Sequence, residues 1–288
     1  MALLEYEPQQ PLYHYCSPAG FEGILKSKVL WFHDLTQMND PRELELGFEH
    51  FIGGLTSVRH DEYQGHRGFF LSILAGKLAG LRESHQAFCC CFSLADDELP
   101  LWGEYTGYSG LSIGFKPTAV KNIQARVQKA DYLSDTTGKT YRAKVLDIAA
   151  LYDPDGETHD ERFWTNASVV AFAAITALKH NSWAYEREIR MIHLQAKEAP
   201  GTSSTLVSAV DDDYERTAPS KRIAERGEVS YLPFEFGRYR DGNDRHRRAI
   251  VKVTIGPKCP LTIDDVDNML DANGYLGVDV VRSECRIR

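Results

Sequence analysis

Apolar residues recur along the chain at two spacings, which predict short strands together with amphipathic helices. Leu111, Ile113 and Phe115 alternate with other residues, as in a half-buried strand. Residues 160–179 carry apolar side chains at helical spacing throughout, which predicts a helix from Asp160 to Lys179. Further strands are predicted at 12–15, 29–33, 88–93, 250–255 and 278–281.

Helix starts are marked by residues that cap helices well. Ser17 precedes Pro18, and Thr262 precedes a run that stops near Asn273, so both positions predict the first turn of a helix. Asp40 occupies a third such position, in the run Asn39-Asp40-Pro41-Arg42-Glu43. These starts divide the chain into helices of ordinary length.

The order of these elements predicts the fold class. Strands and helices do not alternate regularly, no repeat is visible, and no Gly-rich phosphate loop follows a strand. The pattern therefore favours an α+β fold with a mixed sheet flanked by helices over a doubly wound nucleotide fold. We expect residues 1–288 to form one domain, with a surface excursion at about 196–228, a segment rich in Asp, Ser, Thr, Pro and Gly.

Composition excludes several classes of protein. Hydrophobic residues make up 43% and charged residues 26% of the chain, as in ordinary globular proteins. The longest apolar stretch, residues 169–178, has about half the length that a bilayer span needs, and the N-terminal residues lack the pattern of a signal peptide. We therefore expect a cytoplasmic protein with no membrane partner.

The six cysteines are predicted to be reduced. Cys89, Cys90 and Cys91 are consecutive, so they point to alternate faces of a strand and cannot form a disulfide framework or a zinc site by themselves. Cys-x-x-Cys and His-x-x-x-His spacings do not occur in the sequence. The sequence predicts buried thiols and no metal site.

The charges along the chain point both against and toward binding of nucleic acid. The formal net charge of −8 argues against broad electrostatic binding. A local cluster, Arg238 to Arg248, nevertheless places five arginines beside Tyr239 and His246. This cluster is either a phosphate- and base-binding segment or a solvated loop before a strand.

The strongest candidate for chemistry is the carboxylate pair Glu186 and Glu188, in the run Trp183-Ala-Tyr-Glu-Arg-Glu-Ile-Arg190. On a strand, Glu186, Glu188 and Arg190 would share one face, with the two carboxylates about 7 Å apart. Such a pair offers one group to stabilise a cation and another to accept a proton. On a helix, Glu186 and Arg190 would instead form an ordinary ion pair.

Other single residues have structural explanations. His14 lies between Tyr13 and Tyr15 in an apolar strand, where a hydrogen-bonded core histidine is common. Trp102 and Tyr105 lie three residues apart, so they could be neighbours in a helical core.

Taken together, however, these motifs resemble a known family. Tyr13-His-Tyr15, Met38-Asn-Asp-Pro-Arg-Glu43, Cys91-Phe-Ser93, Trp102 with Tyr105, Gly110 to Phe115 and Trp183 to Arg190 follow in the order seen in a widespread bacterial family of uncharacterised domains. The layout also resembles the ADP-ribosyltransferase fold, a mostly antiparallel split sheet flanked by helices. It is most similar to the branch with a His, Tyr, Glu triad and to DNA-targeting toxins.

That resemblance implies roles for individual residues. His14 would bond a ribose hydroxyl of NAD, the backbone of Tyr15 would hold the nicotinamide amide, and Tyr105, which follows the strand that ends at Ser93, would stack on the nicotinamide ring. Glu188 would stabilise the oxocarbenium-like charge as the glycosidic bond breaks, and Glu186 would orient or deprotonate the acceptor. Ser93, Asn39 and Asp40 would complete the NAD pocket, although Asn39 and Asp40 could equally cap a helix.

Three functions are therefore predicted. The first is an NAD-dependent ADP-ribosyltransferase, acting as a toxin or anti-phage effector on DNA, RNA or protein without a metal. The second is an NAD glycohydrolase that uses the same site with water as acceptor. The third, from a different class, is a non-catalytic domain that binds nucleic acid through the arginine cluster.

Overall fold

The computed structural model describes residues 5–38, 43–61, 66–121, 123–133, 139–150, 161–197, 218–224, 227–237 and 246–287. The strands in these residues are β1 (Leu12–Cys16), β2 (Val29–Asp34), β3 (His85–Ser93), β4 (Leu111–Phe115), β5 (Arg126–Lys129), β6 (Asp131–Leu133), β7 (Leu178–His180), β8 (Glu188–Ala196), β9 (Ser220–Ala224), β10 (Gly227–Glu235), β11 (Ile250–Ile255) and β12 (Asp279–Arg282).

Helices connect and cover these strands. The α-helices are α1 (Pro18–Ser27), α2 (Glu43–Asp61), α3 (His66–Ser84), α4 (Leu99–Thr106), α5 (Pro117–Val120), α6 (Lys139–Ala149), α7 (Glu161–Thr176) and α8 (Ile263–Ala272). Short 3-10 helices are η1 (Leu35–Gln37), η2 (Asn181–Glu186) and η3 (His246–Arg248). Among the described helices, none is both long and apolar enough to cross a lipid bilayer.

One mixed sheet organises the molecule, and the predicted α+β class is confirmed. Its strand order is β12-β11-β4-β1-β3-β2-β10-β9, with β8 also pairing with β3, and β5 with β8. Every pairing in it is antiparallel except that of β11 with β12. A separate small sheet joins β6 and β7 in parallel.

The sheet is split along one edge of β3. On one side, β8 pairs with β3 over its whole length, from His85 to Ser93. On the other side, β2 pairs with β3 at Phe88 and Cys89, whereas β1 pairs with it at Ser93. β1 and β2 therefore diverge beside residues 90–92, and α1, which connects them, spans the opening.

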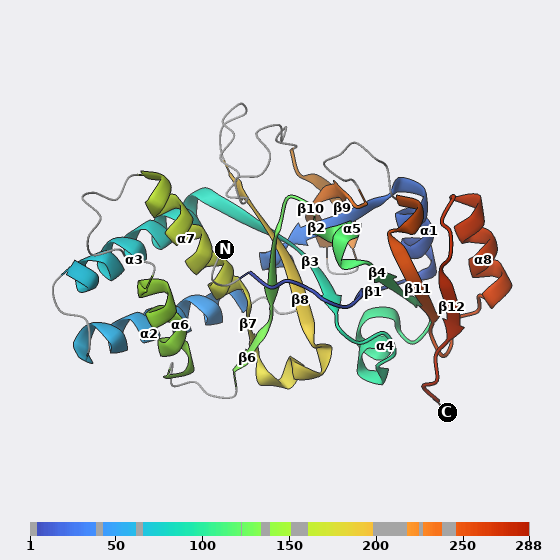
Figure 1. Cartoon of the computed structure of the whole chain (residues 1–288), viewed down its shortest axis with the longest axis horizontal. Coiled ribbons are helices and arrows are strands. Elements are labelled where there is room, and N and C mark those ends of the chain that lie inside the picture. The colour runs from blue at the N-terminus through green and yellow to red at the C-terminus, as the bar shows by residue number, and fades with distance from the viewer. Residues whose placement is uncertain are drawn as a thin grey trace.

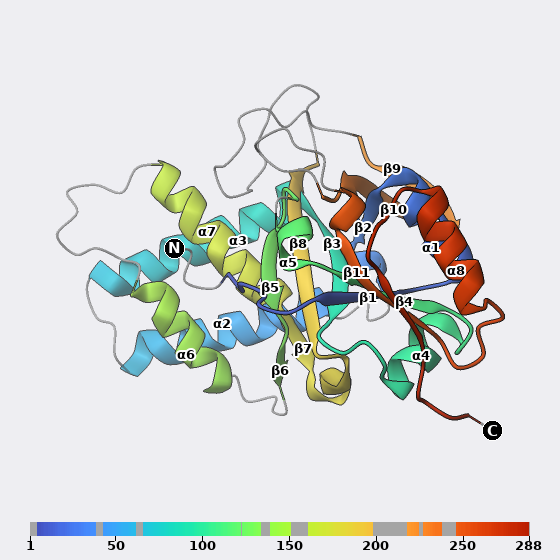
Figure 2. The same ribbon diagram turned by 45° about the vertical axis from the view of Figure 1, so that its right-hand side comes forward.

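Two hydrophobic cores lie on opposite faces of β3 and β8. Phe88 and Phe92 face a core shared with α1, β4, β11 and α8. Ala87 and Cys89 face a second core built by α2, α3, α6 and α7. These four helices gather at one end of the molecule and α1 and α8 at the other, as two views show (Figures 1 and 2).

Two of the predicted helix starts form as local chemistry dictates. The Ser17 side chain accepts a hydrogen bond from the Gly20 N–H, with Pro18 in the first turn of α1. Thr262 and Asp265 form a reciprocal capping box at the start of α8. The third predicted cap, Asp40, lies outside the described residues.

One prediction of secondary structure was wrong in detail. The helix predicted to reach Lys179 ends at Thr176, because residues 178–180 pair with β6 as strand β7. Within the predicted surface excursion at 196–228, Ser220–Ala224 pairs with β10 as an edge strand whose residues 221–223 are exposed. Residues 198–217 of that segment lie outside the described residues.

Candidate active site

A cavity of about 1000 Å³ opens where β1 and β2 diverge from β3. It is lined by β1, α1, β2, residues 89–93 of β3, α4 and the two glutamates of the predicted pair, Glu186 and Glu188. This volume lies at the upper end of the range for ligand-binding pockets. The split in the sheet therefore produces the main candidate site among the described residues.

Six of the eight residues predicted for the site line this one cavity. They come from β1 (His14 and Tyr15), the end of β3 (Ser93), α4 (Tyr105), the end of η2 (Glu186) and the start of β8 (Glu188). The other two predicted residues, Asn39 and Asp40, lie outside the described residues. Positions up to 174 residues apart in sequence therefore converge at the split.

The prediction that the two glutamates share one face of a strand was wrong. Glu186 ends the 3-10 helix η2, Arg187 adopts a left-handed conformation (φ +45°), and Glu188 begins β8. The predicted helical ion pair of Glu186 with Arg190 is also replaced, because Arg190 pairs with Glu188. The turn at Arg187 lets both carboxylates reach the same lysine.

That lysine, Lys179 on β7, holds the carboxylate pair together. Its Nζ donates to Glu186 Oε2 (2.5 Å) and to Glu188 Oε2 (3.1 Å). Arg190 donates to the same Glu188 oxygen (2.9 Å) and to the Thr176 carbonyl (2.6 Å). All four charged side chains are buried, so two carboxylates and two cations form an electrically balanced cluster beside the cavity.

The cluster shifts the pKa values of the two carboxyls in opposite directions. Burial alone would raise the pKa of Glu188, but the positive charges of Arg190 and Lys179 lower it to about 2. Burial and the negative charge of Glu188 raise the pKa of Glu186, against the effect of Lys179. Glu188 is thus a fixed anion at neutral pH, and Glu186 is the better proton acceptor of the two.

His14 spans the split with its side chain. Its Nδ1 lies 3.0 Å from the carbonyl oxygen of Cys91, within the part of β3 that pairs with neither β1 nor β2. Burial lowers the pKa of His14, so the ring is neutral near pH 7 and Nδ1 carries the proton donated to that carbonyl. Nε2 is then left as a hydrogen-bond acceptor.

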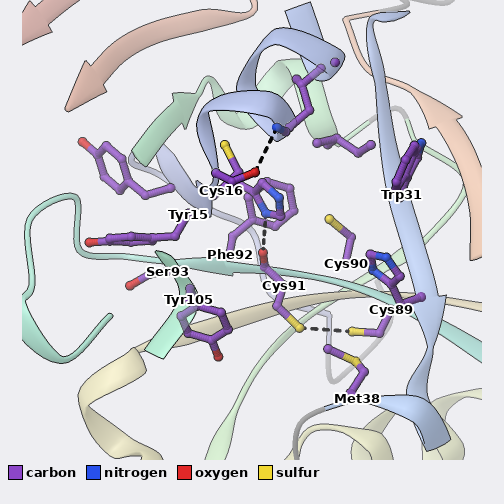
Figure 3. Close-up of a pocket in the computed structure, with 18 of the residues that line it drawn as sticks. Tyr15, Cys16, Trp31, Met38, Cys89, Cys90, Cys91, Phe92, Ser93 and Tyr105 are labelled. Atoms are coloured by element: carbon purple, nitrogen blue, oxygen red, sulfur yellow. Dashed lines mark hydrogen bonds between the residues drawn. The ribbon is translucent and has the colours of Figure 1, made fainter. Parts of the chain in front are cut away.

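Tyr105 closes over the acidic end of the cavity from α4. Its hydroxyl donates to Glu186 Oε1 (2.5 Å), and burial beside Glu186 and Glu188 raises its pKa, so it stays protonated. Tyr105 as a whole residue is 37% exposed, which leaves part of it open to a ligand. In Figure 3 it lies on the same side of the pocket as Tyr15, with Trp31 and Met38 on the far side.

Ser93 and Tyr15 act as supports for this end of the cavity. Ser93 Oγ donates to the backbone carbonyl of Glu186 (2.7 Å) and accepts from the Ala95 N–H (3.0 Å). The Tyr15 hydroxyl donates to the carbonyl of Ala95 (3.1 Å), and its ring meets Trp102 edge to face at 4.7 Å. Both contacts fix the chain that carries Glu186 and α4.

Two thiols point toward one another in the floor of the cavity. Cys89 and Cys91 lie on the same face of β3 with their sulfur atoms 3.6 Å apart (Figure 3). A hydrogen bond with Cys89 and burial raise the pKa of Cys91, so this thiol stays protonated. Among the described residues, no group of three or more His, Cys, Asp and Glu side chains is arranged to hold a metal ion.

Sequence reasoning missed Lys179 and the far end of the cavity. Lys179 is predicted only as the last residue of a helix, and nothing in its neighbourhood distinguishes it from other helical lysines. Trp31 and His33 of β2 and Arg222 of β9 also line the cavity, but these two strands are far apart in sequence and share no motif. The predicted arginine cluster falls mostly outside the described residues, although Arg247 and Arg248 are exposed in η3.

The fold and site thus define an α+β protein with a buried, balanced glutamate pair at a split sheet. A family model described as a protein of unknown function (DUF2971) matches residues 101–191, the segment from α4 to β8 that holds Tyr105, Lys179 and both glutamates. Similarity to a family of uncharacterised proteins is therefore confirmed for that segment. No curated protein and no solved structure matches the chain.

Proposed function

We propose that this chain is an NAD-dependent ADP-ribosyltransferase, with the split sheet as an ADP-ribosyltransferase-like fold and NAD as substrate. One observation carries the proposal. Glu188 is a buried carboxylate whose pKa is lowered to about 2, and it lines one cavity with His14 and Tyr105. A fixed anion beside a neutral histidine and an aromatic ring suits a substrate that becomes more cationic at a sugar carbon as it reacts.

The proposed reaction begins with cleavage of the bond between nicotinamide and its ribose. The bonding electron pair stays on the nicotinamide nitrogen, which becomes neutral and leaves, while positive charge develops on the ribose as an oxocarbenium ion. The Glu188 carboxylate stabilises that charge. An acceptor nucleophile then bonds to the ribose carbon, and its proton passes to Glu186, whose raised pKa suits this task.

The remaining residues would bind the substrate. Tyr105 is partly exposed and offers its ring to the nicotinamide, and the Nε2 of His14 accepts a hydrogen bond from a ribose hydroxyl. The backbone of Tyr15 holds the nicotinamide amide. Ser93 contributes indirectly, because its hydroxyl holds the carbonyl of Glu186.

Hydrolysis of NAD is a second candidate, and one observation favours it. Both carboxylate oxygens of Glu186 already accept hydrogen bonds, one from Tyr105 and one from Lys179. Glu186 is also buried, so the space left beside these bonds suits water better than a large acceptor. The two reactions share the first step and differ only in the nucleophile.

Release of nicotinamide from NAD tests the shared step. We expect the wild-type protein to release nicotinamide, and Glu188→Gln to reduce the rate by about a hundredfold or more, as loss of one preorganised electrostatic group does. Glu161→Gln is the control for loss of one carboxylate, because Glu161 is exposed at the start of α7, pairs with Lys77 and does not line the cavity.

The products separate the candidates. Label from the adenosine half of NAD should appear on a macromolecule if transfer occurs, and free ADP-ribose alone indicates hydrolysis. If the wild-type protein releases no nicotinamide, and Glu188→Gln matches it in every assay, both enzyme functions are wrong and a binding function remains.

A further inference from the structure

The far end of the cavity continues onto an open face of the sheet with a different chemistry. Trp31 and His33 lie two residues apart on β2, so their side chains point to the same face of the sheet. Tyr231 of β10 lies opposite His33. Arg222 of β9 lies opposite Val229, which is two residues before Tyr231 on β10. These four side chains, Trp31, His33, Arg222 and Tyr231, therefore share one face, and we refer to them as the aromatic platform. Trp31, His33 and Arg222 also line the cavity.

The contacts within the platform are those of a stacking site. The rings of Trp31 and Tyr231 stack with centroids 4.5 Å apart and planes 30° from parallel. The Arg222 guanidinium lies over the Trp31 ring at 5.5 Å. Trp31 is nevertheless 44% exposed, so this aromatic surface faces solvent instead of being buried in the core.

Polar groups beside the platform are available to a ligand. Arg222 is exposed, and among the described residues that line the cavity it is the one Lys or Arg side chain. No described residue hydrogen-bonds the buried Nε2 of His33. Burial, with Arg222 nearby, lowers the pKa of His33 to about 4, so this ring is neutral.

We propose that the aromatic platform binds single-stranded nucleic acid, with a base stacked on Trp31 and a phosphate on Arg222, and leads a nucleotide toward the glutamates as acceptor. A base would displace the guanidinium from the indole, and the freed arginine would reach the adjacent phosphate. The acceptor part of this proposal rests on the proposed transferase activity. The binding part does not.

The shape and charge of the region favour a flexible strand. The platform runs from the cavity to the edge strand β9, where Arg222 is exposed, so a chain can continue outward over open surface. A net charge of −8 disfavours duplex DNA, whose binding depends on many phosphate contacts. Base stacking needs few charges and requires unpaired bases, which a single strand supplies.

Fluorescence anisotropy with short labelled oligothymidylate and oligouridylate tests the binding, with a duplex of the same length for comparison. We expect the single strands to bind more tightly than the duplex, and Trp31→Ala to weaken that binding about tenfold. Arg222→Gln should weaken it and reduce the slope of log affinity against log salt by about 0.7, the share of one phosphate contact. The DNA and RNA arms show which strand is preferred.

Lys221→Gln is the matched control. Lys221 is adjacent to Arg222 on β9 but points to the opposite face, where it pairs with Glu228 (2.7 Å). The same loss of charge there should leave the affinity for the oligonucleotides unchanged. Far-UV circular dichroism of each variant confirms that these exposed substitutions leave the fold intact.

Three outcomes would overturn the proposal. The wild-type protein could fail to bind either single strand, or Trp31→Ala could bind as tightly as wild type. Alternatively, Trp31→Ala and Arg222→Gln could raise the KM for NAD without changing oligonucleotide affinity, in which case the platform holds the adenosine half of NAD.

Nicotinamide release without oligonucleotide keeps this test separate from that of the transferase activity. Platform-dependent binding without any nicotinamide release would support the platform and contradict the enzyme. If nicotinamide is released but no adenosine label reaches a bound oligonucleotide, the acceptor part of the proposal is wrong.

Discussion

At the scale of single residues, the site depends on one lysine. Lys179 is buried and contacts both glutamates, and it also lies 5.0 Å from the ring of Trp183. Without it, two buried carboxylates would face the one cation Arg190 in a region of low polarity. A buried ion pair adds little net stability, but breaking one leaves an uncompensated charge and is costly.

We therefore predict that Lys179→Met destabilises the protein by about 3–5 kcal/mol. The double variant Lys179→Met with Glu186→Gln should recover part of that loss, because the second change removes the charge left without its partner. Urea unfolding of the wild type, the two single variants and the double variant measures the coupling free energy between Lys179 and Glu186.

A surface lysine provides the comparison for this cycle. Lys121 pairs with Glu7 at 2.9 Å, and both side chains are mostly exposed, so Lys121→Met should cost less than about 1 kcal/mol. If Lys179→Met costs as little as Lys121→Met, or if Glu186→Gln makes it worse, the glutamates do not depend on Lys179 as described.

At the scale of elements, the C-terminal segment holds α4 and thereby Tyr105. The carboxylate of Asp97, just before α4, accepts hydrogen bonds from Trp102 Nε1 (2.6 Å), Ser283 Oγ (2.5 Å) and the Glu284 N–H (2.7 Å). Burial opposes ionisation of Asp97, but these bonds lower its pKa. This junction fixes the position of α4 beside Glu186.

We predict that Asp97→Ala lowers the free energy of unfolding by about 1–3 kcal/mol, since it removes hydrogen bonds to a charged group. It should also raise the KM for NAD, because α4 then holds Tyr105 less firmly. The lowered pKa means that this stabilisation is present above the pH where aspartate ionises in the unfolded chain, and is lost as pH falls through the folded value. Unfolding measured from neutral to acidic pH checks both points.

Ser283→Ala distinguishes the C-terminal contact from the effect of Trp102, and it should cost about 1 kcal/mol. An Asp97→Ala protein with unchanged stability at neutral pH, or a larger difference from wild type in acid, would contradict this account.

Elements set by local chemistry could be predicted from the sequence, and those set by distant pairing could not. Ser17 and Thr262 begin helices as predicted, because a cap needs only its own next few residues. The end of α7 was misplaced because Leu178 and Lys179 fit the helical pattern, and only pairing with β6 makes them a strand.

The same division applies to the site. His14, Tyr105 and Glu188 were found from motifs and lie in one cavity, whereas their roles remain predictions. The relation of Glu186 to Glu188 depends on the left-handed conformation of Arg187, a residue type that does not signal such a turn. The aromatic platform could not be foreseen, because the register of β2, β9 and β10 brings it together.

At the scale of the whole molecule, β3 and β8 belong to both hydrophobic cores. Met191 of β8 packs in the core beside α1 and α8, and Leu194 of the same strand packs in the core of α2, α3, α6 and α7. The glutamate cluster likewise connects the two parts. Its Lys179 comes from β7, which contacts the helices, and its Glu188 and Arg190 come from β8 in the sheet. The helical end cannot unfold without exposing one face of the strands that hold the site.

We therefore predict a single cooperative unfolding transition, as expected for one domain. Leu74→Ala in α3 and Leu25→Ala in α1 truncate fully buried residues of the two cores, and each should cost about 2–5 kcal/mol. In both variants, far-UV circular dichroism and tryptophan fluorescence should shift together, because Trp164 reports on the helices and Trp31, Trp102 and Trp183 report on the sheet and site. If Leu74→Ala instead separates the two signals and leaves the sheet folded, the helical end is an independent unit. Nicotinamide release, if present, would then survive its unfolding.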